Sequence, residues 1–214
     1  MAMIKITETL GSTVNISGMH LAELTTDELG KPAAYGEIYH VRGSQDIKVN
    51  KDQESVANWG DGEKQEEAVS QGDSKVDLQA FALPLELRAW LAGMEVSEDG
   101  LVTQYGGVID PPVVGTIFYK ERLNKDVEAI GFTRGTYVVG DDEGKSSEEG
   151  KVDFSNHSMS GEFTQRRCDN IKERRRIIKK DDYATLDKFF IEVFSKPAPV
   201  TAQPKGWKPR PEIV

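Results

Sequence analysis

The sequence predicts a mainly β, α+β domain that carries one or two helices. Short runs of alternating or aromatic-rich residues recur along the chain and are separated by Gly, Pro, Asn and Asp turns. Two segments instead repeat apolar residues at i, i+3, i+4 and i+7, which is the period of an amphipathic helix. The 214 residues, of which 37% are hydrophobic, suffice for one core but not comfortably for two.

The first part of the chain predicts strands and then a long polar loop. Residues 15–24, 35–41 and 45–49 fit an antiparallel meander in length and turn spacing. Residues 50–74 are polar and acidic, and a loop is expected there, far longer than an ordinary hairpin connection. Such a loop in a compact domain is either disordered or used for contact. An isolated tryptophan in such a loop, here Trp59, more often packs against its own domain. The alternative is that it anchors a partner.

The middle of the chain predicts a strand, a short flanking helix and further strands. Residues 75–83 alternate between apolar and polar, as in a half-buried strand. Pro84 then suits the first helical position, and Gly93 suits the helix end. Residues 113–120 are almost continuously apolar, so both faces of this strand should be covered. More strands are expected at 101–105, 126–139 and 152–165, with an acidic loop at 140–150.

The last part of the chain predicts a C-terminal helix. Residues 183–194 carry Leu186, Phe189, Phe190 and Val193 at helical spacing, and 171–180 could be extended. Asp181 or Asp182 would cap the start of this helix, and five of the nine prolines follow it. The expected organisation is an N-terminal arm at 1–14, a β domain at 15–195 and an extended or disordered Pro-rich tail at 196–214.

Sequence signatures of catalysis and metal binding are absent. His20, His40 and His157 lie far apart in the sequence, and no Cys-x-x-Cys pair supports a zinc site. No nucleophile elbow, phosphate-binding loop or dinucleotide fingerprint occurs. The single cysteine, Cys168, excludes an internal disulfide; two adjacent arginines would lower its pKa, but an incidental thiol is favoured over a nucleophile. We therefore expect no enzyme, no cofactor and no metal site.

The charge is distributed unevenly. The formal charge of −9 argues against general attraction to nucleic acid, and no segment is long and apolar enough to span a membrane. The run from Arg166 to Lys180, however, contains eight basic residues and only two acidic ones. A nucleic-acid patch is one interpretation, but this run lacks aromatic residues for base stacking. A solvated or self-complementary face is favoured, whose Arg174, Arg175 and Arg176 would meet an acidic surface of the next subunit.

The order of these segments resembles the major tail protein family of long non-contractile-tailed phages, in particular the phi13-type tail proteins. No single motif is diagnostic, and the resemblance rests on the ordered set across about 15 to 195. The basic stretch at 172–180 departs from the family pattern. The matching segments are SGMHLAEL, YGEIYHV, DIKV, LPLELRAWLAGMEVSEDGLV, SMSGEFTQRR and LDKFFIEVF.

The resemblance implies a structural virion protein. Members form hexameric rings that stack into a hollow tail tube, through which DNA passes without specific binding. The implied subunit is an antiparallel β-sandwich or small barrel with a short flanking helix and a C-terminal helix. Implied partners are further copies and the tape measure, distal tail and tail terminator proteins, with assembly in the host cytoplasm. The alternatives are a related ring-forming tail component, such as a terminator or distal tail protein, and a non-viral β-rich binding module.

The resemblance also gives the long polar loop a role, because in similar tube proteins such a loop reaches between subunits or rings. The acidic balance would suit a lumen that repels DNA phosphates. The candidates for inter-subunit contact are Val56, Trp59, Glu63 and Glu66 in the loop and Arg174, Arg175 and Arg176 in the basic run.

Overall fold

The computed structural model describes residues 12–60, 63–140 and 156–210. Strands predominate among the described residues and helices are few, which confirms the predicted mainly β, α+β class. The elements are β1 (Thr13–Thr26), β2 (Ala34–Val41), β3 (Ser44–Gly60), β4 (Glu63–Ala80), α1 (Leu85–Leu91), β5 (Glu95–Val96), β6 (Val102–Thr103), β7 (Val114–Arg122), β8 (Val127–Val139), β9 (His157–Thr164), β10 (Glu173–Ile178), α2 (Tyr183–Phe194) and a short 3₁₀ helix, η1 (Val200–Ala202).

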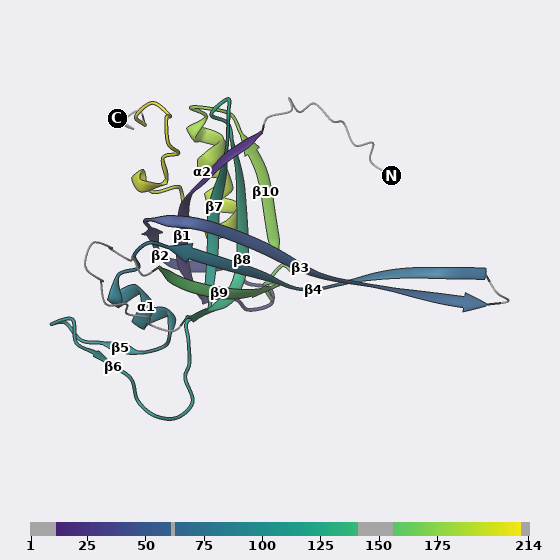
Figure 1. The fold of residues 1–214 in the computed structure, drawn as a ribbon, viewed down its shortest axis with the longest axis horizontal. Coiled ribbons are helices and arrows are strands. Elements are labelled where there is room, and N and C mark those ends of the chain that lie inside the picture. Colours follow the sequence, from purple (N-terminus) through teal and green to yellow (C-terminus); the bar gives the residue numbers. More distant parts are fainter. Residues whose placement is uncertain (1–11, 61–62, 141–155, 211–214) are drawn as a thin grey trace, which may run out of the picture.

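One antiparallel sheet organises the molecule. Its strand order is β2-β1-β7-β8-β9-β4-β3, and a separate two-stranded sheet joins β5 to β6. β8 pairs with β9 through Arg134–Val139 and with β10 through Val127–Phe132. β9 and β10 therefore follow one another along β8. Figure 1 shows β7, β8 and β10 rising past the crossing pair β3 and β4.

The inner core lies inside the curl of this sheet. Although β1 and β3 are far apart in the strand order, they contact one another, because the sheet curls toward closure. α1 covers part of the same core through Leu91. The main sheet supplies buried side chains from seven strands, among them Met19, Val41, Ile47, Leu78, Phe118, Phe132 and Phe163.

A second core lies between the opposite face of the sheet and α2. Ile117 and Tyr119 of β7 face this side, whereas Phe118 between them faces the inner core. Both faces of this strand are therefore covered, as its continuous apolar sequence predicted. The helix contributes Leu186, Phe189, Phe190, Val193 and Phe194.

The predicted C-terminal helix is confirmed at its expected bounds. Asp182 is the N-cap, and its carboxylate accepts hydrogen bonds from the backbone N–H of Thr185 at 3.0 Å and its hydroxyl at 2.8 Å. Ser195 ends the helix in a left-handed conformation, with φ of 57°. The short helix after Pro84 is also present, followed by Gly93 at φ of +69°.

Two predictions, one about the pairing of the first three strands and one about the C-terminal tail, are wrong. The first three strands do not form a meander, because β3 pairs with β4 rather than with β2. The tail is not extended or disordered through residue 210, since Ala198, Ala202 and Trp207 are buried in the second core. The Trp207 indole N–H donates a 2.9 Å hydrogen bond to the carbonyl of Lys125. Most of the predicted N-terminal arm and acidic loop, and part of the predicted strand at 152–165, lie outside the described residues.

Candidate assembly site

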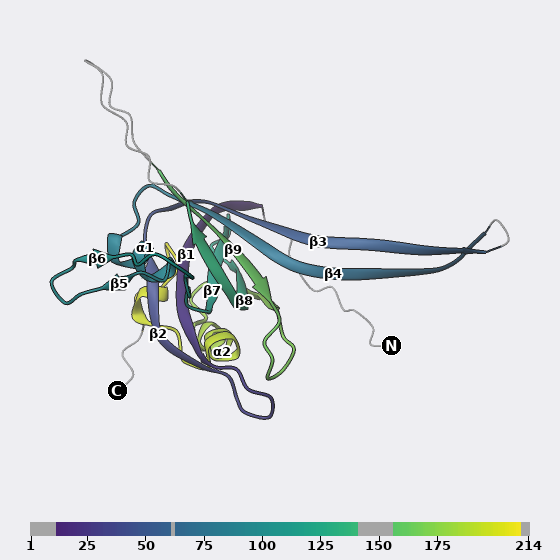
Figure 2. The ribbon, with the colours of Figure 1, turned by 90° about the horizontal axis from the view of Figure 1, so that it is seen from below.

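The predicted loop at 50–74 is instead the outer part of a long β-hairpin. β3 and β4 remain paired from Ser44↔Ala80 to Gly60↔Glu63. β4 also pairs with β9, but only between Ser74 and Ala80. Beyond that point the two strands leave the body as a two-stranded ribbon, called the arm here and comprising residues 51–60 and 63–73. Figures 1 and 2 show from two directions that the arm projects far from the rest of the chain.

The arm carries four of the predicted contact residues. Val56 lies opposite Ala68 and is 61% exposed, and Val69 of the other strand is 65% exposed. The backbone pairs Trp59 with Lys64, Gly60 with Glu63 and Asn58 with Glu66. The structure therefore brings Val56, Trp59, Glu63 and Glu66 into one projecting segment, but in strands rather than in a loop.

The base of the arm contacts the first residue of β10 and the residue just before this strand. Lys51 forms an ion pair with Glu173 at 2.5 Å, and the Lys172 ammonium donates a 2.7 Å hydrogen bond to the Gly72 carbonyl. Burial alone would raise the pKa of Glu173, but hydrogen bonds from Lys51 and Arg175 outweigh it and hold that pKa below its usual range. A polar cleft of about 800 Å³ lies between the arm base and residues 164–165 and 170–173.

The three predicted contact arginines lie on β10 and have carboxylate partners within the chain. Arg176 pairs with Glu192 of α2 at 2.9 Å, and Arg174 approaches the same carboxylate at 3.8 Å. Arg175 pairs with Glu173 and, at 3.5 Å, with Glu128. The three arginine side chains are 36–39% exposed, whereas their carboxylate partners are 11–33% exposed, so part of each guanidinium remains open to solvent.

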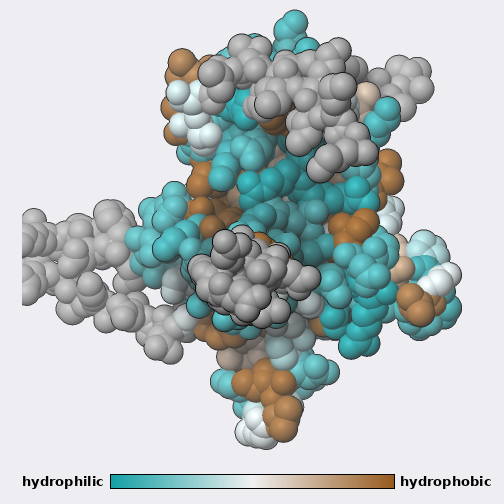
Figure 3. Space-filling view, turned by 90° about the vertical axis from the view of Figure 1, so that its right-hand side faces the viewer, coloured by the Kyte–Doolittle hydropathy of each residue, from teal (hydrophilic) through white to brown (hydrophobic). Residues whose placement is uncertain are grey.

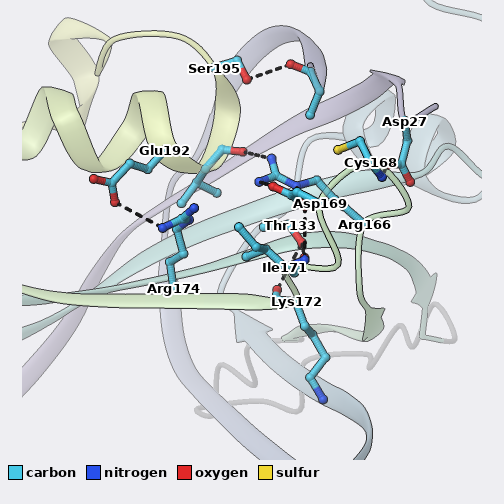
Figure 4. A network of polar contacts seen from close by, with 12 residues as sticks. Asp27, Thr133, Arg166, Cys168, Asp169, Ile171, Lys172, Arg174, Glu192 and Ser195 are labelled. Atoms are coloured by element: carbon cyan, nitrogen blue, oxygen red, sulfur yellow. Dashed lines mark hydrogen bonds and ion pairs between the residues drawn. The ribbon is translucent and has the colours of Figure 1, made fainter. Parts of the chain in front are cut away.

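The first arginine of the basic run has a structural role that the sequence did not reveal. Arg166 is 3% exposed and donates to Asp169 at 2.6 and 3.1 Å and to the Val193 carbonyl at 3.1 Å. Its charge thus lies at the C-terminal end of α2, where a cation is favoured by the helix dipole. Figure 4 shows how this arginine connects the loop between β9 and β10 to the helix.

Cys168 lies in the same loop, and its predicted pKa shift is wrong in direction. Burial is the largest cause and raises the pKa of this thiol, and the nearby Asp169 raises it further. Asp27 accepts hydrogen bonds from the backbone N–H groups of Arg167 at 2.8 Å and Cys168 at 3.0 Å. The adjacent positive charge that the sequence offered is therefore offset by two carboxylates and by partial burial.

Two histidines that are 20 residues apart in sequence meet across β1 and β2. His20 lies directly opposite His40, and their rings stack with centroids 4.7 Å apart. A bulge at Gly18, which has φ of +64°, turns His20 toward the second core, where its ring meets Phe190 edge-on. Burial first, and the His40 charge second, lower the pKa of His20 to about 4. The pair results from the antiparallel register of β1 and β2, which the spacing of the two histidines in the sequence does not indicate.

An apolar groove of about 440 Å³ lies beside α1. It is lined by Tyr39 and His40 of β2, by Pro84, Glu86, Leu87 and Trp90 around the helix, and by Val96. Its single permanently charged lining residue is Glu86. The groove and the arm are thus two separate exposed surfaces with apolar content.

In the described part of the chain, no three His, Cys, Asp or Glu residues are arranged to hold a metal ion. No helix there is long and apolar enough to cross a membrane. The chain matches no model of a known protein family, and no curated protein is similar to it in sequence.

Proposed function

We propose that this chain is the major tail tube subunit of a long non-contractile phage tail. In this proposal, hexameric rings of the subunit stack into a hollow tube through which DNA passes, assembled in the host cytoplasm and located in the virion. The arm is the observation that carries the proposal. The ordered resemblance of the sequence segments supplies the protein class.

The arm needs a partner for physical reasons. A two-stranded ribbon is marginally stable alone, because neither of its faces is buried. Val56 and Val69 remain exposed, and the figures show the outer arm away from the body. A neighbouring subunit that covers this ribbon would stabilise it, and every copy both supplies an arm and can receive one. Such head-to-tail contacts generate rings or open-ended stacks.

The sheet edges support the same proposal. Among the described residues, β2 and β3 end the strand order, and β10 pairs with β8 alone. Exposed edges are a liability unless another strand pairs with them or a neighbour covers them. Closure of several copies into a ring would satisfy these edges. The formal charge of −9 would also discourage DNA from adhering to a lumen formed by the chain.

Removal of the arm tests the proposal directly. Lys51 and Ser74 are directly opposite one another, so an Asn-Gly turn can join them and replace residues 52–73. We expect a folded monomer with the circular dichroism spectrum of a β-rich protein that cannot form rings or tubes. Electron microscopy of the full chain and the shortened chain at equal concentration measures this. Tubes from the shortened chain would reject the role of the arm.

The alternatives give different particles in the same experiment. Closed single rings that never stack would favour a tail terminator or distal tail component. A full chain that stays monomeric and retains a separate macromolecular partner would favour a β-rich binding module.

A further inference from the structure

A hollow on the body combines positive charge with one exposed apolar side chain. It encloses about 270 Å³ and is lined by Arg122, Glu128, Arg175, Arg176 and Ile177, and it is called the basic hollow here. Ile177 is 37% exposed and lies directly opposite Glu128, which in turn lies opposite Lys120. Opposite residues of an antiparallel pair share a face, so Lys120 adds a further positive charge beside the hollow.

The arm has the complementary composition. Its residues, 51–60 and 63–73, include six acidic and two basic ones, a formal charge of −4. Glu54 and Val56 are both exposed and are two residues apart in β3, so they lie on one face of the ribbon. The arm thus presents a carboxylate next to an apolar side chain, and the hollow presents arginines next to an apolar side chain.

We propose that the arm of one copy docks across the basic hollow of a neighbouring copy. Val56 lies against Ile177, and Glu54 approaches Arg122 and Arg175. The choice of a second copy as the occupant rests on the proposed function. The outer arm cannot fill the hollow of its own copy, because it projects away from the body (Figures 1 and 2). Seen from the side to which the arm points, the described surface around it is mostly hydrophilic, with separate apolar spots (Figure 3).

Charge decides between the two receiving surfaces on the body. The groove beside α1 is larger and more apolar, but Glu86 is its one permanently charged lining residue. An acidic ribbon would meet like charge there and gain no ion pair. In the hollow, the guanidinium of Arg175, which is 39% exposed, can pair with a carboxylate of the incoming arm in addition to its less exposed partners Glu173 and Glu128. Pairing of rim charges predicts assembly that weakens with added salt.

Single-cysteine variants locate the contact. In a Cys168→Ser background, Val56→Cys and Ile177→Cys are made separately and mixed, so that any disulfide between them joins two copies. We expect a dimer on mild oxidation of the mixture that is at least about fivefold more abundant than from either variant alone. Val69→Cys mixed with Ile177→Cys is the matched control for the other strand of the arm. No excess dimer in the first mixture, or an equal one in the control, overturns the proposal.

A charge exchange tests the electrostatic part. Glu54→Lys and Arg175→Glu should each raise the protein concentration needed for assembly by about tenfold, and the double variant should return to within about threefold of the original. Glu98→Lys, the same change in an exposed turn, should have little effect. A double variant no better than the single ones overturns the pairing. If all variants form normal tubes, the proposed function stands and this docking fails; if the original chain never assembles, the proposed function fails and the cysteine mixture alone decides the docking.

Discussion

The body and the arm use the same antiparallel pairing but differ in what covers their strands. In the body, alternate residues of β7 face two separate cores, so its sequence is apolar almost throughout. In the arm, the described side chains from Lys51 to Val56 are all exposed. The strands of the body are therefore stabilised by two cores. The two strands of the arm are stabilised only by their pairing with each other and by the contacts at the base of the arm. A ribbon of this kind is what the proposed contact between copies requires.

The largest expected effect on the free energy of unfolding comes from a substitution in the inner core, and a matched substitution on the arm should have almost none. Phe132→Ala removes a fully buried ring that stacks on Phe118 and meets Phe163 in the inner core, and should lower the free energy of unfolding by about 3–5 kcal/mol. Val56→Ala, on the exposed arm, should change it by less than about 0.5 kcal/mol. Urea denaturation of the monomer measures both values. A comparable loss from the two substitutions would mean that the arm is buried in the monomer.

A smaller effect should appear as the pH falls. The fold favours neutral His20, whose pKa is lowered to about 4, so the unfolded chain takes up protons first as the pH drops below 6.5. Stability from this group is complete above pH 6.5 and declines toward pH 4, by up to about 3 kcal/mol. His20→Leu should flatten that part of the stability profile, measured by denaturation at each pH. An unchanged slope in His20→Leu would contradict this assignment.

A still smaller effect than that of His20 is expected at the base of the arm. Lys172→Met removes the hydrogen bond to the Gly72 carbonyl and should cost less than about 1 kcal/mol. It should nevertheless speed amide hydrogen exchange around residues 71–73, because one of the two contacts at the arm base is lost. Lys75→Met changes a neighbouring exposed lysine and serves as the matched control. Equal exchange in both variants would show that the arm base is held by its strand pairing alone.

The sequence predicted those elements whose residues interact locally or face a core. The bounds of α2 follow from its apolar stripe and from Asp182, and the covering of both faces of β7 follows from its composition. The arm was mistaken for a loop because a ribbon exposed on both faces has no alternating pattern. Burial of Trp207 depends on a distant core, which local composition cannot indicate.

The structure places Val56, Trp59, Glu63 and Glu66 in one projecting ribbon, whereas the predicted loop conformation was wrong. Their role in contact between copies stays a prediction. The basic run was found, but its division into buried Arg166 and exposed β10 arginines depends on contacts with α2. The His20–His40 pair depends on strand register, and the basic hollow joins β7, β8 and β10; neither could be derived from spacing.

The central claim is that the arm exists to join copies of this chain. Negative-stain electron microscopy of the concentrated full chain, paired with light scattering for mass, tests it most directly. The account predicts hollow tubes or stacked six-fold rings whose mass grows with concentration. A monodisperse particle of 23.7 kDa at every concentration and at low salt would contradict it.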